Sequence, residues 1–212
     1  METLKGLFAD FGLERKGSGD FQSFNRVYQR ENAQCWADYR AGRMEKEVLR
    51  TERFKRALSG FGIEDASLAE SMGMEYVNRG PHQRHLLPGT LEVLEALRGR
   101  GHDIHILTNG FSEIQHIKVE NTGIAQWIDA LLTSEQLGAL KPARKCYEGA
   151  LEATGALANQ AWMIGDDHEA DVVGAHEAGW KSVYFNPSGG EIDGSPAVAT
   201  VSTLRELLAV LP

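Results

Sequence analysis

Residues 163–171 read MIGDDHEAD, an apolar run that ends abruptly in acidic side chains. The apolar start predicts a buried strand over residues 161–164, and the pattern of residues 171–178 predicts a helix. A strand that runs through a short loop into a helix is the repeating unit of parallel α/β sheets. This part of the chain is therefore predicted to form a parallel sheet with crossover helices.

The same alternation extends over residues 81–212. Further strands are predicted at residues 104–107, 130–133 and 182–185, and further helices at residues 91–97, 112–120, 143–153 and 204–208. Capping boxes are predicted at two helix starts, Ser112 with Gln115 and Thr203 with Glu206. The predicted fold class is α/β, a three-layer Rossmann-like parallel sheet, for residues 81–212.

Residues 1–80 have a different character, because every periodic segment there is helical. Phe21, Phe24 and Tyr28 recur at helical spacing, and Asp20 and Asp65 are the expected N-caps of two helices. The character changes between residues 79 and 88. The predicted organisation is an α-helical bundle domain over residues 1–80, followed by the α/β domain.

Composition and charge exclude several classes of partner. The 212 residues carry a formal net charge of −8 and a sequence pI of about 5.4, which argues against a nucleic-acid polymer. No apolar run approaches the roughly 20 residues that a membrane span needs, so no membrane partner and a cytoplasmic location are expected. Cys35 and Cys146 match no metal or redox spacing and are expected to be reduced, buried thiols.

Two polar clusters lie where predicted strands end or predicted helices begin, which is where open α/β sheets bind their ligands. Thr108-Asn109-Gly110 offers a hydroxyl and backbone N–H groups to an anion, although such a stretch can also be an ordinary turn. Lys141, followed by Pro142 at an expected helix start, offers a fixed positive charge, although a lone lysine is usually a solvated surface residue.

The third cluster is the acidic loop with Asp166, Asp167 and Asp171. Several carboxylates within six positions repel one another unless a cation neutralises them. Mg2+ prefers one or two carboxylates together with phosphate and water oxygens, so the loop predicts a hard-metal site. A merely solvated acidic turn is the alternative.

In combination, the three clusters have a familiar order: a strand ending in Thr108, then Lys141-Pro142, then an apolar strand ending in Gly-Asp-Asp-x-x-x-Asp at residues 165–171. This order resembles motifs II, III and IV of the haloacid dehalogenase (HAD) superfamily of Mg2+-dependent phosphohydrolases. The stretches 108–111 and 134–142 are similar to the branch that contains pyrimidine and other nucleoside 5′-monophosphatases. The helical residues 4–79 resemble the α-helical cap of that branch, so the resemblance covers nearly the whole chain.

The resemblance implies a role for each motif residue. Thr108, with the backbone at Asn109 and Gly110, would bind the transferring phosphoryl group, and Lys141 would balance the charge on nucleophile and phosphate. Asp166 would bind Mg2+ directly and take part in catalysis, while Asp167 and Asp171 would lie at the metal or just beyond its direct ligands. Such electrostatic stabilisation is what phosphoryl transfer chiefly requires of a protein.

The family's first motif, Asp-x-Asp-x-Thr after an apolar strand, is absent from this sequence. The nearest candidate nucleophile, Asp10, lies in a helical pattern, with Gly12 where the second aspartate belongs. We therefore expect that roughly 20–25 residues, about one strand and one turn, are missing upstream. In the family that strand lies in the middle of the sheet, and its absence would leave two strands with unpaired edges.

The leading hypothesis is an HAD-like, Mg2+-dependent phosphomonoesterase that acts on a small phosphorylated metabolite such as a nucleoside 5′-monophosphate through an aspartyl-phosphate. The expected assembly is a monomer or homodimer. One alternative is a 2-haloacid dehalogenase, which works without metal, and Asp166 and Asp167 speak against it. The other alternative is a pseudoenzyme that binds phosphate and metal without turnover.

Overall fold

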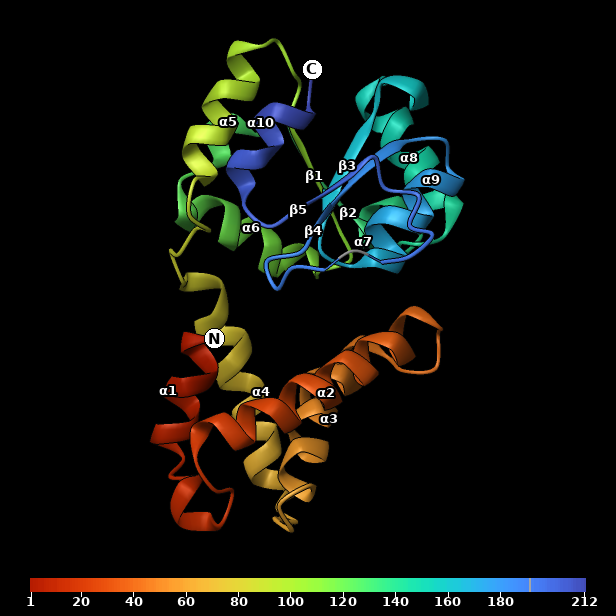
Figure 1. Cartoon of the computed structure of the whole chain (residues 1–212). Helices are drawn as coiled ribbons and strands as arrows, with labels where there is room; N and C mark the ends of the chain where they lie inside the picture. The colour runs from red at the N-terminus through yellow and green to blue at the C-terminus, as the bar shows by residue number, and fades with distance from the viewer. Residues whose placement is uncertain (191) are drawn as a thin grey trace. The chain divides into compact units, whose positions relative to one another are not determined.

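The computed structural model describes residues 1–190 and 192–212 and divides the chain into two compact units, Met1–Gln83 and Arg84–Pro212 (Figure 1). The division falls within the stretch 79–88, where the sequence changes character. Within the described ranges, no helix is long and apolar enough to cross a membrane.

The first unit is entirely helical. Its helices are α1 (Glu2–Asp10), α2 (Phe21–Arg40), α3 (Lys46–Ser59) and α4 (Ala66–Arg79), with short 3-10 turns at Glu14–Lys16 and Gly80–His82. The two predicted N-caps are confirmed: the Asp20 carboxylate accepts a hydrogen bond from the backbone N–H of Ser23 at 2.8 Å, and that of Asp65 accepts one from Leu68 at 2.9 Å.

Aromatic side chains fill the core of the helical unit. Phe24, Tyr28 and Phe54 are almost completely buried, and the Tyr28 and Phe54 ring centroids are 5.1 Å apart. Gly73 brings α4 close to α3, because a Cβ at this position would lie 2.8 Å from the carbonyl oxygen of Arg50. The apolar pattern at helical spacing in the sequence is therefore the pattern of this core.

In the described residues of the second unit there are five strands, parallel within their sheets: β1 (His105–Thr108), β2 (Ala130–Thr133), β3 (Trp162–Gly165), β4 (Lys181–Phe185) and β5 (Ala199–Val201). They form two sheets, with β1 paired to β2 and with β3, β4 and β5 in that order. The four predicted strands are confirmed to within one residue, and β5 is an additional strand that the sequence pattern did not predict.

Helices cover the strands of this unit on two sides, with α5 (Thr90–Gly99) and α10 (Leu207–Val210) on one side and α8 (Arg144–Thr154) and α9 (Gly174–Glu177) on the other (Figure 1). Val93 and Leu97 of α5 pack with Val183 of β4. Tyr147 of α8 and Met163 of β3 belong to one buried cluster, and Leu107 of β1 packs against that cluster. The three-layer α/β arrangement is therefore confirmed.

The remaining helices are α6 (Ser112–Thr122) and α7 (Ser134–Leu137), with 3-10 turns at Ala125–Trp127, Ala158–Gln160 and Leu204–Glu206. The predicted helix over residues 171–178 is only partly right, because a π-helical turn, His168–Val173, precedes α9. Pro142 lies before α8 rather than in its first turn.

The two predicted capping boxes have different outcomes. Thr203 with Glu206 is confirmed. The box of Ser112 with Gln115 is wrong, because Ser112 is already the first residue of α6 and the residue before it provides no side-chain cap. The Ser112 hydroxyl instead lies 2.5 Å from the Thr133 hydroxyl, and its N–H donates to the Glu135 carboxylate at 2.7 Å.

The two sheets leave strand edges without a strand partner. Among the strands within residues 1–190 and 192–212, β1 pairs with β2 alone and β3 with β4 alone. Each of these strands therefore has one edge whose backbone groups are not paired to another strand. This is the pattern of unpaired edges that the sequence predicts for a sheet without its middle strand.

Candidate active site

The predicted site residues of the second unit gather where parallel strands end. Thr108 is the last residue of β1, and Asp166 follows directly after β3. Lys141 comes from the loop between α7 and α8, and its side chain spans from the end of β1 to Asp171. Strand direction thus brings together three motifs that lie far apart in the sequence.

Lys141 is buried, and both its side chain and its backbone are hydrogen-bonded within the site. It is only 6% exposed, and its ammonium donates to the carbonyl oxygen of Leu107 at 2.9 Å and to the Asp171 carboxylate at 2.5 Å. Its backbone N–H and carbonyl are both bonded to the Asn109 side chain, each at 2.8 Å. The interpretation of Lys141 as a solvated surface residue is therefore wrong.

Asp171 is the buried partner of that lysine, with an exposure of 6%. Its second carboxylate oxygen accepts a hydrogen bond from the N–H of Asp167 at 3.1 Å. A side chain at Gly165 would collide with it, because a Cβ there would lie 2.6 Å from the Cβ of Asp171. Gly165 is thus the residue that allows the carboxylate to approach the end of β3.

The acidic loop does not form the predicted three-carboxylate cluster. Within the part of the chain that the structure describes, no group of three or more His, Cys, Asp or Glu side chains could hold a metal ion. Asp171 pairs with Lys141, and the Asp167 carboxylate caps the following turn by accepting from the N–H of Ala170 at 3.0 Å. Asp166 is exposed. Because Mg2+ needs only one or two carboxylates, with waters and substrate oxygens completing its shell, Asp166 fits such an ion.

Thr108 and Gly110 form a small turn at the end of β1. The Thr108 hydroxyl oxygen accepts a hydrogen bond from the N–H of Gly110 at 3.0 Å. A hydroxyl that accepts in this way keeps its own proton for donation to an anion. The Asn109 side chain contacts Lys141, a role that the sequence did not reveal because the two residues are 32 positions apart.

Burial raises the pKa of two residues of α8, Cys146 near Lys141 and Tyr147 near Asp171. Burial raises the pKa of the Cys146 thiol to about 11, although the charge of Lys141 acts in the opposite direction. Burial, followed by the negative charge of Asp171, raises the pKa of the Tyr147 hydroxyl, which donates to the carbonyl oxygen of Ala170. Both cysteines are free and buried, as predicted.

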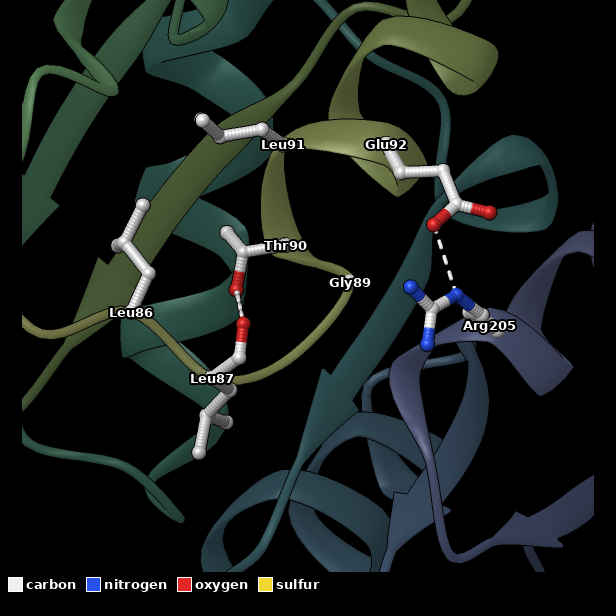
Figure 2. Close-up of a pocket in the computed structure, with 7 residues that line it drawn as sticks. All are labelled: Leu86, Leu87, Gly89, Thr90, Leu91, Glu92 and Arg205. Carbon is white, nitrogen blue, oxygen red and sulfur yellow. Dashed lines mark hydrogen bonds and ion pairs between the residues drawn. The ribbon is translucent and has the colours of Figure 1, made fainter.

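A surface pocket of about 310 Å³ lies elsewhere in this unit (Figure 2). Its lining contains none of the predicted site residues. Figure 2 shows the ion pair at one side, where the Arg205 guanidinium lies 2.7 Å from the Glu92 carboxylate. Residues of three kinds line it, apolar, small and charged: Leu86, Leu87, Gly89, Thr90, Leu91, Glu92 and Arg205. We assign no chemistry to this pocket, because convergent catalytic groups are lacking among its lining residues.

Asp10, the weak candidate nucleophile, belongs to the helical unit. It is the last residue of α1, and its carboxylate is paired with the guanidinium of Arg79. Both side chains are substantially exposed, 56% for Asp10 and 42% for Arg79. The helical interpretation of this segment is confirmed.

The fold and these residues define a class: α/β proteins that present a threonine, a buried lysine and an acidic loop at the carboxyl ends of parallel strands. The sequence profile of the haloacid dehalogenase-like hydrolases matches residues 7–179. The chain therefore belongs to the haloacid dehalogenase-like hydrolase family.

Characterised relatives include phosphatases. The chain is 32% identical over 210 residues to the pyrimidine 5′-nucleotidase YjjG of Escherichia coli. The aligned region covers 98% of this chain and 89% of the relative. It is 34% identical over 188 residues to the ribulose-1,5-bisphosphate 5-phosphatase of Halopiger xanaduensis, covering 88% of this chain and 77% of the relative. It is 30% identical over 177 residues to the pyrimidine 5′-nucleotidase PynA of Streptococcus pneumoniae, covering 82% and 73%.

Solved structures show the same fold. The HAD-hydrolase YfnB of Bacillus subtilis, in a structure with bound magnesium, superimposes with a TM-score of 0.84 at 22% identity, over 99% of this chain and 89% of the other. The L-2-haloacid dehalogenase of Xanthobacter autotrophicus superimposes with a TM-score of 0.74 at 19% identity, over 98% and 92%. At these identities the likeness concerns the fold alone.

Proposed function

We propose that the protein is a Mg2+-dependent phosphomonoesterase acting on a small phosphorylated metabolite, a nucleoside 5′-monophosphate in the first instance. The observation that carries the proposal is the buried ammonium of Lys141, which donates to the carbonyl oxygen of Leu107 in β1, one residue before Thr108. A fixed positive charge beside a hydroxyl and a backbone N–H suits the oxygens of a phosphoryl group. The nucleotide preference rests on the pyrimidine nucleotidases among the relatives.

Each site residue has a proposed part in this chemistry. The Thr108 hydroxyl and the Asn109 N–H bind phosphoryl oxygens, and Lys141 offsets their charge. The Gly110 N–H donates to the Thr108 hydroxyl oxygen and so orients that hydroxyl rather than binding the phosphate directly. Asp166 is the proposed direct ligand of Mg2+, which would further neutralise the phosphate. Relative to the sequence-based expectation, Asp171 is reassigned from the metal to Lys141, because its carboxylate is engaged there. The helical unit is proposed to act as the substrate-selecting cap.

The nucleophile is proposed to come from a strand that pairs with the open edges of β1 and β3. Such a strand, carrying Asp-x-Asp-x-Thr, would deliver its first aspartate to the edge of the sheet where Thr108 and Lys141 lie. This is tested in the DNA upstream of the Met1 codon. An in-frame apolar strand with this motif supports the proposal, and an in-frame stop directly upstream, with a stable short monomer, favours the binding pseudoenzyme.

Turnover assays distinguish the three activities. With the upstream strand present, hydrolysis of p-nitrophenyl phosphate and nucleoside monophosphates should require Mg2+, while 2-chloropropionate should not react. The 212-residue chain should hydrolyse these phosphates negligibly, since removal of a nucleophile lowers the rate by several orders of magnitude. Rapid turnover by the 212-residue chain would contradict this account and make Asp10 the candidate nucleophile.

Binding assays test the assignments without turnover. In titration calorimetry, Asp166→Asn should weaken Mg2+ binding and leave orthovanadate binding largely intact. Thr108→Val and Lys141→Ala should show the reverse, because they remove a donor and a charge from the anion rather than from the metal. Unchanged Mg2+ affinity in Asp166→Asn would overturn the metal assignment, and unchanged vanadate affinity in both other variants would overturn the anion site.

A further inference from the structure

Residues 107–109, at the end of β1, bond both the side-chain ammonium and the backbone of Lys141. Leu107 accepts a hydrogen bond from the ammonium at 2.9 Å. Two residues further on, the Asn109 carboxamide accepts from the Lys141 N–H and donates to the Lys141 carbonyl, each at 2.8 Å. A lysine side chain has four rotatable bonds, so its ammonium is placed only when the backbone that carries it is also placed.

We propose that Asn109 is a positioning residue for the phosphoryl site, acting through Lys141 rather than on the substrate. Its carboxamide closes a two-way hydrogen-bonded ring with the backbone of Lys141, which connects the end of β1 to the loop before α8. The proposal rests on the proposed function for the role of Lys141. The ring itself stands on the geometry alone.

The chemistry of the side chain accounts for asparagine at this position. Asn109 has to accept with one group and donate with the other on adjacent main-chain atoms, and a carboxamide presents both at the same fixed spacing. Aspartate could accept from the Lys141 N–H but could not donate to its carbonyl. A leucine of similar size could do neither. Asparagine, aspartate and leucine can therefore make two, one and no hydrogen bonds to the Lys141 backbone.

The direct test is the NMR signal of the Lys141 ammonium in protein labelled with 15N-lysine. A buried, hydrogen-bonded ammonium exchanges its protons slowly with water, so its signal is visible near neutral pH where those of exposed lysines are lost. Lys141→Arg identifies the signal by removing it. We expect Asn109→Leu to abolish or strongly shift this signal and Asn109→Asp to shift it less.

A matched control is available in the same unit. The Asn186 carboxamide also bonds the main chain, donating to the carbonyl oxygens of Gly189 at 2.7 Å and Gly190 at 3.0 Å. Asn186→Leu therefore removes a similar set of bonds away from Lys141. It should leave the Lys141 signal in place, whereas a general loosening of the fold would affect both variants alike.

Orthovanadate affinity gives a second readout. Asn109→Leu should weaken vanadate binding about tenfold, the factor expected when one or two hydrogen bonds no longer hold the charge in place. In a Lys141→Ala background the same change should have no further effect, because the positioned charge is already gone.

The outcomes separate this inference from the proposed function. If the wild-type chain binds no vanadate, the proposed function fails and the Lys141 signal alone decides the inference. An unchanged Lys141 signal in a folded Asn109→Leu or Asn109→Asp variant would overturn the inference. So would an equal loss of vanadate affinity in the Lys141→Ala background, because Asn109 would then contact the anion itself.

Discussion

Replacing Asp171 with asparagine tests the buried ion pair with Lys141 most directly, because the change removes one charge and keeps the shape. The two side chains are each 8% exposed and lie 2.5 Å apart, so the remaining ammonium would stay in the interior without its counter-charge. Breaking a buried pair in this way typically destabilises a protein by about 3–5 kcal/mol. The two donors use different carboxylate oxygens, and asparagine has only one, so its NH2 group would face either the Lys141 ammonium or the Asp167 N–H. The lower end of the range, about 3 kcal/mol, is therefore the smallest loss we expect.

Urea denaturation measures this effect. Trp36 is the sole tryptophan of the helical unit, so a Trp36→Phe background restricts tryptophan fluorescence to the α/β unit. With a slope of about 2 kcal/mol per molar urea, a loss of about 3 kcal/mol lowers the midpoint by about 1.5 M. The slope itself should not change, because the surface exposed on unfolding is the same.

The exposed pair of Glu92 with Arg205 is the matched control, since these side chains are 53% and 60% exposed and 2.7 Å apart. Glu92→Gln should move the midpoint by less than about 0.5 M, because solvent screens an exposed pair. Adding Lys141→Met to Asp171→Asn should restore part of the lost stability. Equal midpoints for Asp171→Asn and Glu92→Gln, or strictly additive single changes, would refute the account of a strong buried pair.

Three further predictions concern packing and pH. Gly165→Ala should destabilise the α/β unit by about 1–3 kcal/mol in urea, because the new methyl group would overlap Asp171. Gly73→Ala should lower the melting temperature of the helical unit followed by circular dichroism, because the methyl group would press on the α3 backbone; Gly6→Ala, with open space around it, should raise it. Burial raises the pKa of the Cys146 thiol from 9.0 to about 11, so this thiol should resist an aromatic disulfide reagent at pH 8. Because the unfolded thiol ionises near pH 9 and the folded one near pH 11, its contribution to the free energy of unfolding should decline as the pH rises from about 9 through 11. Rapid labelling of the native protein at pH 8 would contradict this prediction.

The strands of this protein could be predicted closely because their pattern is local. Residues 130–133 are both the predicted and the observed strand, since an apolar run bounded by polar residues is visible without tertiary information. Strand β5 was missed because Ala199–Val201 is three residues long and includes a threonine, too short for a pattern. The Ser112 capping box failed because Thr133 and Glu135, more than 20 residues away, bond to its hydroxyl and N–H.

The candidate site was predicted as a set of residues but not as a set of contacts. The sequence indicates that Thr108, Lys141 and the acidic loop act together, because each follows a strand or opens a helix. It does not indicate that Asp171 turns to Lys141, because that bond joins positions 30 residues apart and depends on how the two sheets approach. The sequence did not reveal the bonds of the Asn109 side chain to Lys141 for the same reason, because they join positions 32 residues apart.

The position of Lys141 has a consequence for the cooperativity of the α/β unit. Its ammonium is bonded to a carbonyl of β1, in one sheet, and to a carboxylate that follows β3, in the other. Opening either sheet would release this lysine from one partner and leave its charge poorly compensated in the interior. The central amides of the two sheets are therefore expected to share one opening free energy in native-state hydrogen exchange, as a single foldon rather than two.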